Sequence, residues 1–165
     1  MTIVVSNTSP ITSLAAIGHF DLLRELFGRI HIAQGVWAEL NQGGRRHPGS
    51  QEVESASWIE RHGVENRNFV TILRRDLDRG EAETLALALE LKAGLVLLDE
   101  QEGRHAASRL GLQPLGVLGI LLQAKRLQKI EEVRSRLNAL RRQAGFFLGD
   151  RLYREVLAQA GEEAG

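Results

Sequence analysis

Acidic side chains flank the most hydrophobic stretch of the sequence, which runs from Gly80 to Glu100. Glu81 lies at the start of a predicted helix. Asp99 and Glu100 follow the apolar run Leu95 to Leu98, which is typical of a parallel strand covered on both faces. In such a unit the helix runs back along the strand, so the helix N-terminus and the strand C-terminus share one edge of the sheet. We therefore expect Glu81 near Asp99 and Glu100, at the edge where open α/β sheets bind ligands.

Carboxylates gathered at such an edge repel one another unless a cation separates them, and their pKa values then rise. Mg²⁺ or Mn²⁺ suits such a group, because hard divalent ions take oxygen ligands, keep bound water and bridge to phosphate oxygens. The pattern leaves a second interpretation open. Glu81 could be a first-turn acid that interacts with the helix dipole, and Asp99 and Glu100 could cap the next helix. On the long helix itself, Glu83, Glu90 and Lys92 form the predicted solvent-facing stripe.

The first strand ends in polar residues. Thr2 to Val5 is a β-branched run, and Ser6 to Pro10 reads as a turn that leads into a helix. If this strand is parallel to Leu95 to Leu98, Asn7 and the hydroxyls of Thr8 and Ser9 reach the same edge as Glu81 and Asp99. A helix N-cap is the alternative for Asn7. A further acid, Glu39, falls in the predicted helix Gln34 to Leu40, where the local pattern favours an ordinary surface residue.

Composition limits the classes of protein that fit. With 165 residues, 43% hydrophobic and 25% charged, the chain suits one compact domain, 1–165, with C-terminal helices over 118–160 packed on it. The absence of cysteine excludes disulfides, thiolate metal sites and a cysteine nucleophile, and favours a reducing cytoplasm. No apolar run reaches the roughly 20 residues of a membrane span, and the N-terminus lacks the charged start of a signal peptide. We expect a cytoplasmic protein that is not bound to a membrane.

Basic residues concentrate near the C-terminus, although the net charge of the chain is zero. Lys125 to Arg142 contains seven basic residues and two acids, on predicted amphipathic helices. Lys125 and Arg126 could contact phosphates there, or the run could be solvated surface. Arg104 falls on a predicted helix, Gln101 to Leu110, close to the acidic edge.

The other predicted elements are less distinct. The pattern indicates a strand over Arg29 to Ala33, a flexible connection over Asn41 to Ser50, a short helix over Glu52 to Ile59, a strand within Val64 to Leu73, and an edge strand over Leu112 to Val117 that Pro114 interrupts.

Four segments occur in a distinctive order along the chain, IVVSNTSPITSLAAIGHFDLLRELF, VWAEL, GEAETLALALELKAGLVLLDEQEGR and LGVLGILLQAKR. Together they resemble a small bacterial family of PIN-like proteins, and the resemblance covers essentially the whole chain. It implies a three-layer α/β/α sandwich with a central, mostly parallel sheet. Many PIN domains are Mg²⁺- or Mn²⁺-dependent ribonucleases that act on single-stranded RNA, and some are the toxins of toxin–antitoxin pairs.

The resemblance implies an acidic metal pocket. Its first position falls on Asn7, with the following hydroxyl near Ser9, and the later positions fall on Glu39, on Glu81 and on Asp99 or Glu100. Asn7 departs from the family, which usually has aspartate there, and one neutral amide oxygen should hold a metal less tightly than a carboxylate.

Three functions are consistent with these observations. The chain could be a metal-dependent nuclease with Glu39, Glu81, Asp99 and Glu100 as catalytic residues and with Ser9, Arg104, Lys125 and Arg126 in contact with single-stranded RNA. It could be a nucleic-acid-binding module that does not hydrolyse its ligand. It could also be an interaction protein that binds an antitoxin-like partner. The resemblance further implies a homodimer. No G-x-x-x-x-G-K-[ST] phosphate loop is present, which disfavours another phosphoryl-transfer fold.

Overall fold

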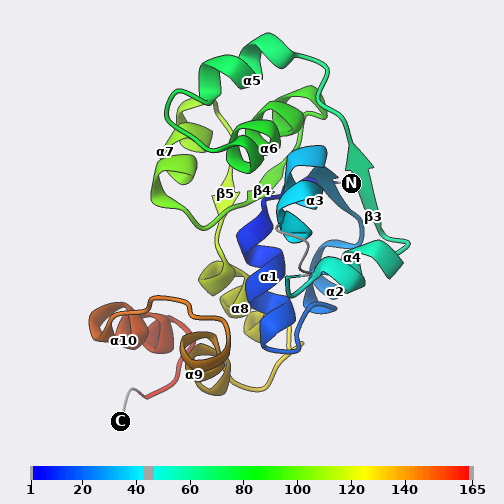
Figure 1. Ribbon diagram of the computed structural model, residues 1–165. Coiled ribbons are helices and arrows are strands. Elements are labelled where there is room, and N and C mark those ends of the chain that lie inside the picture. The colour runs from blue at the N-terminus through cyan, green and yellow to red at the C-terminus, as the bar shows by residue number, and fades with distance from the viewer. Residues whose placement is uncertain (1, 43–46, 164–165) are drawn as a thin grey trace.

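The computed structural model describes residues 2–42 and 47–163, and within them the chain forms a five-stranded sheet whose strands all run parallel. The strands lie in the spatial order β3-β2-β1-β4-β5 (Figure 1). Their bounds are β1 Val4–Ser6, β2 Ile30–Ala33, β3 Ile59–His62, β4 Leu95–Leu97 and β5 Pro114–Leu115. The predicted α/β class with a parallel sheet is confirmed.

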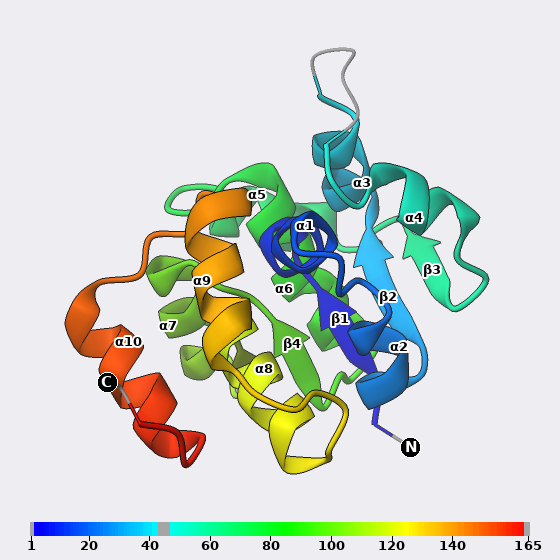
Figure 2. The ribbon, with the colours of Figure 1, turned by 90° about the horizontal axis from the view of Figure 1, so that it is seen from below.

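Helices cover both faces of this sheet, which makes the three-layer α/β/α sandwich (Figures 1 and 2). The layer containing α1, α8 and α9 lies on one face, and the layer containing α5, α6 and α7 lies on the other. The bounds are α1 Thr8–Ala16, α2 Leu22–Phe27, α3 Gln34–Leu40, α4 Ser50–Ser55, α5 Arg67–Leu73, α6 Arg79–Glu90, α7 Gln101–Arg109, α8 Val117–Arg126, α9 Arg134–Gln143 and α10 Asp150–Gln159. In the described ranges, no helix has both the length and the apolar character that crossing a membrane requires.

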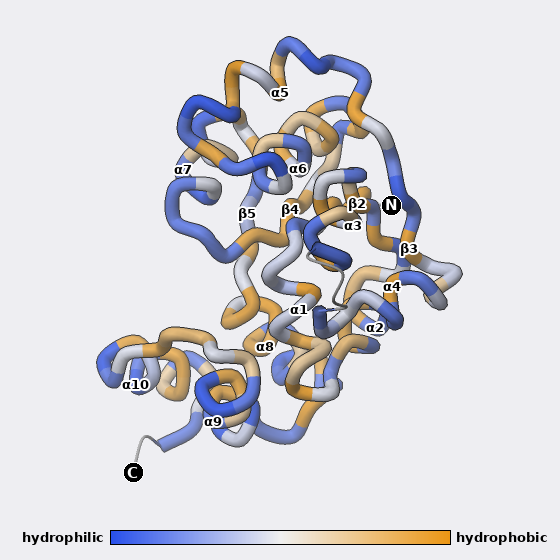
Figure 3. Tube along the Cα trace, viewed as in Figure 1, coloured by the Kyte–Doolittle hydropathy of each residue, from blue (hydrophilic) through white to orange (hydrophobic). Residues whose placement is uncertain are grey.

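Alternation along the strands divides the core between the two faces. Val4 and Leu97 pack into the cluster beneath α1 and α8, whereas Val5 and Val96 pack into the cluster beneath α6 and α7. Figure 3 shows the result, with hydrophobic segments on β4 and α8 inside and hydrophilic segments on the outer turns of α7 and α9. Strands buried on both faces read as continuous apolar runs, which is why 95–98 was recognisable in the sequence.

The strand order reverses beside β1. The chain passes from β1 to β2 and β3 on one side and then crosses to β4 and β5 on the other. Ser6 pairs with Leu97, so β1 and β4 end at the same level. In open parallel sheets the crevice at such a reversal is where ligands bind.

One predicted element is wrong in type and another is wrong in its bounds. The segment 64–73 contains helix α5 rather than a strand, because the Asn66 side chain accepts a hydrogen bond from the Phe69 N–H and caps a helix that buries Val70. The predicted helix over 52–59 ends at Ser55, and Ile59 opens β3 because it pairs with Ile30 of β2. A short apolar run in the sequence does not distinguish a helix from a strand. Contacts with residues distant in the chain decide between the two here.

The predicted solvent stripe of α6 is also wrong at Glu83, which is fully buried. Its carboxylate accepts hydrogen bonds from the Gly35 N–H at 2.9 Å, from Arg79 at 2.9 Å and from Arg67 at 3.1 Å. Burial alone would raise the pKa of Glu83, but these donors together lower it. The charge is therefore retained inside the fold, where it joins α6 to α3 and α5.

The predicted edge strand is confirmed, but it is shorter than 112–117. β5 spans only Pro114–Leu115, and α8 begins at Val117. Proline is tolerated there because β5 is the outermost strand. Part of the predicted connection from Asn41 to Ser50 lies outside the described residues, and its end, Ser50, begins α4.

Candidate functional site

The polar turn after β1 leads into the acidic edge. The Asn7 N–H donates to the Leu97 carbonyl at 2.9 Å and so extends the pairing of β1 with β4. Asn7 occupies the N-cap position of α1 without a side-chain capping bond, which argues against the simple capping role. Its Oδ1 instead accepts from the Thr84 hydroxyl of α6 at 3.4 Å, and the side chain is buried.

Two adjacent hydroxyls bind two acids that come from different elements. The Thr8 hydroxyl donates to Glu39 Oε2 at 2.7 Å, and the Ser9 hydroxyl donates to Asp99 Oδ2 at 2.9 Å. Glu39 is 31 residues from Thr8, and Asp99 is 90 residues from Ser9. The first turn of α1 thus holds both carboxylates in place at the C-terminal edge of the sheet.

Asp99 links three helices at this edge. Besides Ser9 of α1, its Oδ1 accepts from the Val117 N–H of α8 at 2.7 Å. Arg104 of α7 lies beside it, since a Cβ built on Gly116 would come within 2.8 Å of Asp99 Oδ1 and 2.7 Å of Arg104 Nη1. Burial raises the pKa of Asp99, and its hydrogen bonds and Arg104 offset this only in part.

Glu39 packs against the backbone of α6. Gly80 has no side chain, and a Cβ at that position would overlap the Glu39 carboxylate. Burial raises the pKa of Glu39, Asp78 adds to the increase, and the Thr8 hydroxyl and the Gly80 N–H oppose it. The local sequence favoured a surface acid here, whereas the fold half-buries Glu39 and pairs it with Thr8.

Glu81 both caps the N-terminus of α6 and lies close to other acids, so it is consistent with both interpretations of the sequence. It forms a capping box with Asp78, in which the Glu81 N–H donates to Asp78 Oδ1 at 2.8 Å and the Asp78 N–H donates to Glu81 Oε1 at 3.2 Å. Burial nevertheless raises the pKa of Glu81 to about 7, with Asp78 and Glu100 adding negative charge nearby. Its other oxygen faces Gly103 of α7, where a built Cβ would lie 3.1 Å away.

The remaining predicted residues lie farther from these contacts. Glu100 is the exposed N-cap residue of α7, makes no capping bond, and acts on Glu81 and Asp99 through its charge alone. Lys125 and Arg126 lie at the other end of α8, about 12 Å along the axis from Val117. Lys125 also binds Glu162 at 2.8 Å. Contact of this pair with nucleic acid remains a prediction.

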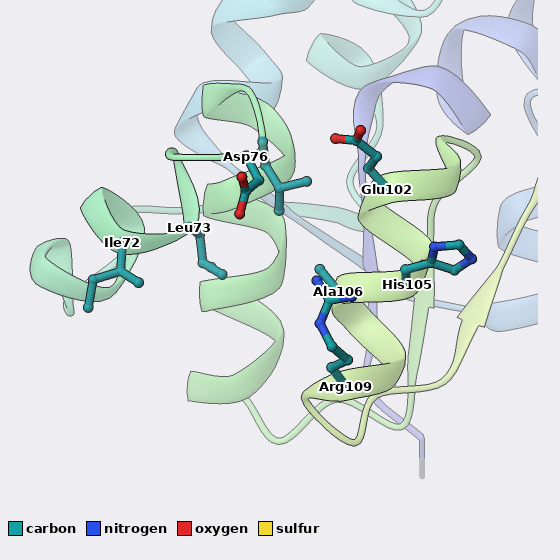
Figure 4. Close-up of a pocket in the computed structure, with 8 residues that line it drawn as sticks. Ile72, Leu73, Asp76, Glu102, His105, Ala106 and Arg109 are labelled. Atoms are coloured by element: carbon teal, nitrogen blue, oxygen red, sulfur yellow. The ribbon is translucent and has the colours of Figure 1, made fainter.

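Three hollows surround these elements. Glu39 and Asp78 line one, and Asp99 and Arg104 line another, which extends to the exposed Phe147 and Leu152. A third lies between α5 and α7, with Ile72, Leu73 and Asp76 on one side and Glu102, Ala106 and Arg109 on the other (Figure 4). None of the sequence-predicted site residues lines that third hollow. Glu39 and Asp99 thus share an edge of the sheet but line separate hollows.

The donor set suits a hard divalent ion. Glu39, Glu81 and Asp99 offer carboxylate oxygens and Asn7 offers an amide oxygen, and burial raises the pKa of all three carboxyl groups. Among the described residues, the oxygens of Glu39, Glu81 and Asp99 do not all lie within 4.8 Å of one another, whereas a histidine-containing group elsewhere is that tight. Mg²⁺ retains several waters, so spaced carboxylates that bind partly through water fit its chemistry.

Sequence reasoning missed Asp78 and Glu83. The spacing of Asp78 and Glu81 is that of a capping box, a signal that would have placed the start of α6 and the charge beside Glu81. The i,i+4 pair of Arg79 with Glu83 is a local signal, but nothing local marks the burial of Glu83, because its other partners, Arg67 and Gly35, lie in other elements.

Comparison with known proteins agrees with this geometry. The family described as DUF3368, a PIN domain, matches residues 3–162. A search of curated proteins found no match to the chain. A PIN domain is a nuclease-type fold, and PIN domains generally use divalent metal ions. The match covers nearly the whole chain, and the parallel sheet with helices on both faces is the one this fold requires, so the chain belongs to the PIN-domain family.

Proposed function

We propose that the chain is a nuclease that depends on Mg²⁺ or Mn²⁺ and cleaves single-stranded RNA. The observation that carries the proposal is the pair of hydroxyl contacts from Thr8 and Ser9, which hold Glu39 and Asp99 at the edge where β1 and β4 end. Residues from four separate parts of the chain meet there, and burial raises the pKa of the carboxyl groups. Such perturbed acids are frequent at catalytic sites.

The chain's own groups have distinct roles in this proposal. Glu39, Asp99 and the Asn7 amide oxygen would hold the ion, and Glu100 would add negative charge. The hydroxyls of Thr8 and Ser9 orient the two carboxylates. A bound divalent ion would supply an activated water and neutralise charge on the phosphodiester. Glu81, with its pKa near 7, can hold or release a proton at neutral pH.

The surroundings of Asp99 support a single-stranded substrate. Arg104 lies beside Asp99 and can pair with a phosphate oxygen. The same hollow reaches Phe147, whose side chain is 91% exposed, and exposed aromatic rings stack with unpaired bases. The N-termini of α1, α7 and α8 also point to this edge, and their dipoles favour anions.

Asn7 favours a second candidate, a PIN domain that binds nucleic acid with little or no cleavage. An amide in place of a carboxylate removes one negative charge from the donor set.

The test of the nuclease proposal is cleavage of an end-labelled RNA of mixed sequence in Mn²⁺, in Mg²⁺ and in EDTA. We expect metal-dependent cleavage that Asp99→Asn lowers about tenfold or more, while Asn can still accept the hydrogen bond from Val117. Glu102→Gln, which removes an exposed acid of α7, should leave cleavage unchanged.

The variant Asn7→Asp separates the two candidates. The added carboxylate should lower metal-free stability, tighten Mn²⁺ binding and raise cleavage, because one more charge crowds the same edge. Asn66→Asp is a matched control, because it adds the same charge at an N-cap where aspartate caps equally well. Absence of metal-dependent cleavage in both wild type and Asn7→Asp would favour the binding module.

The nuclease could act as the toxin of a toxin–antitoxin pair, which is a more specific form of the first candidate. Repeating the assay with the product of the neighbouring gene tests it, since an antitoxin must suppress cleavage.

A further inference from the structure

A second group of ligating side chains lies on β2 and on β3, the outermost strand on that side of the sheet (Figure 1). His31 Nδ1 is 2.9 Å from His62 Nε2, and Glu60 Oε2 is 3.2 Å from His31 Nδ1 and 3.8 Å from His62 Nε2. Among residues 2–42 and 47–163, this is the group of three histidine or acidic side chains whose ligand atoms all lie within 4.8 Å of one another. The acidic edge contributes no residue to it.

Strand register brings these side chains together. His31 pairs with Glu60 across the parallel ladder, and His62 pairs with Ala33 two residues farther along. Because strand side chains alternate between faces, Glu60 and His62 point to the same face as His31. The centroid of the His62 ring lies 5.1 Å from that of His31. The three side chains are therefore positioned by backbone pairing rather than by a flexible loop.

The separations match those required around a small ion. Zn²⁺ binds histidine nitrogen and carboxylate oxygen at about 2.0 to 2.2 Å, so two ligand atoms on a tetrahedron lie about 3.3 Å apart. The three observed distances, 2.9, 3.2 and 3.8 Å, bracket that value. Two histidines and one glutamate are also a known ligand set of zinc sites that leave a fourth position for water.

The surroundings orient the ligands and leave them accessible. Arg29 Nη1 binds the other carboxylate oxygen of Glu60 at 3.3 Å, which directs Oε2 toward both rings. The side chains of His31 and His62 are 13% and 28% exposed, so an ion can reach them without opening the core.

We propose that His31, Glu60 and His62 form a binding site for a divalent transition-metal ion of the zinc type, separate from the acidic edge. Imidazole nitrogen favours Zn²⁺, Cu²⁺ and Ni²⁺ over Mg²⁺ and Mn²⁺, which prefer oxygen. The two sites therefore differ in the ions they select. A bound ion would join β3, the outermost strand on this side, to β2 and so stabilise the edge of the sheet.

The test titrates the metal-free chain with Zn²⁺ by calorimetry in the presence of excess Mg²⁺, which occupies oxygen-only sites. We expect one Zn²⁺ per chain. Long-range ¹H–¹⁵N spectra should show ring-nitrogen shifts at His31 and His62 and none at His47 or His105. His62→Gln should weaken Zn²⁺ binding about tenfold or more, whereas His105→Gln, on the exposed face of α7, should not change it.

Glu60→Gln provides a second variant that keeps the size of the side chain and removes its charge. We expect it to weaken Zn²⁺ binding as well, while far-UV circular dichroism shows the fold retained in every variant. Equal Zn²⁺ affinity in wild type and His62→Gln, or ring-nitrogen shifts at other histidines only, would overturn the proposal. The outcome does not depend on whether the chain cleaves RNA, because the readouts are binding and nitrogen shifts.

Discussion

At the scale of single residues, burial determines the charge of the acidic edge. Burial is the largest cause of the raised pKa values of Glu39, Glu81 and Asp99. Arg79 near Glu39 and Arg104 near Asp99 offset it only in part, whereas Arg67 and Arg79 together with the Gly35 N–H lower the pKa of Glu83. Two acids on one helix, Glu81 and Glu83, thus shift in opposite directions. The difference lies in their partners, since Glu83 binds two guanidinium groups and Glu81 faces other carboxylates.

Glu81→Gln tests this account through the pH dependence of stability. A folded-state pKa of about 7, raised from 4.5, means that the folded chain retains a proton that the unfolded chain releases. The free energy of unfolding of wild type should therefore fall as pH rises from about 4.5 to about 7. Glutamine keeps the capping-box acceptor and cannot ionise, so the variant should be more stable above pH 7. The full shift corresponds to about 3 kcal/mol, which solvent screening of this partly accessible group reduces to about 2 kcal/mol. Urea unfolding across this pH range measures the effect.

The control for this prediction is Glu52→Gln, which removes an exposed acid from α4 and should leave the pH profile unchanged. A loss of about 1 kcal/mol or more in metal-free Glu81→Gln would mean that the helix-terminus interaction outweighs the charge repulsion.

At the scale of elements, carboxylates from one element accept hydrogen bonds from backbone N–H groups at the N-termini of other helices. Glu83 of α6 accepts from the Gly35 N–H in α3, and Asp99 after β4 accepts from the Val117 N–H in α8. Neither α3 nor α8 has a side-chain N-cap of its own, so these acids satisfy backbone donors that would otherwise lack partners. Glycine permits the close approach of α6 to α3, since Gly80 leaves space for Glu39.

Gly80→Ala tests the role of that close approach. Alanine within a helix is normally more stabilising than glycine, by about 1 kcal/mol, but here its Cβ would displace the Glu39 carboxylate. We expect the metal-free free energy of unfolding to change by less than about 1 kcal/mol and the stabilisation by Mn²⁺ to fall. Thermal unfolding with and without Mn²⁺ measures both quantities.

Gly63→Ala is the matched control, because a Cβ there meets no atom within 4 Å. It should leave the Mn²⁺ response unchanged. An unaltered Mn²⁺ response in Gly80→Ala would remove Glu39 from the proposed metal site.

At the scale of the whole molecule, one carboxylate joins the C-terminal helices. Glu162, just after α10, accepts from Lys125 Nζ of α8 at 2.8 Å, from the Val133 N–H at 2.7 Å and from the Arg134 N–H at 3.1 Å. Burial opposes the charge of Glu162, but these donors together lower its pKa. Part of the basic run in the sequence therefore serves structure, since Lys125 pairs with Glu162 and Arg141 binds the Leu148 carbonyl.

Glu162→Gln should destabilise the protein near neutral pH by about 1 kcal/mol, because Lys125 and the N–H groups of Val133 and Arg134 lose a charged acceptor in a partly buried cluster. A pKa lowered from 4.5 contributes stability above that value, and the contribution is lost as pH falls through the folded-state pKa. The difference between variant and wild type should therefore shrink in acid. Urea unfolding at neutral and acidic pH checks this, with Glu163→Gln as the control. A difference that is independent of pH would contradict the charged role of Glu162.

The sequence by itself determined the features that depend on local pattern and chain polarity. The buried run 95–98 and the helix before it were enough to place Glu81 and Asp99 at one edge, whereas Asn7 was expected there only on the condition that the first strand is parallel to 95–98, which the pairing of β1 with β4 meets. The reason is physical: an αβ unit with parallel strands allows one relative direction for helix and strand, and both signals lie within about 20 residues. The parallel α/β class followed from the same pattern.

Only the tertiary structure decided the features whose partners are distant in the chain. Thr8 hydrogen-bonds to Glu39, which is 31 residues away in the sequence, and the Gly35 N–H hydrogen-bonds to Glu83, 48 residues away. His31 contacts His62, 31 residues away. Local periodicity carries no information on such pairs, because burial of a charge is determined by the donors that other elements bring to it. For the same reason Glu39 and Glu83 both read as surface acids in the sequence, and the fold half-buries the first and fully buries the second.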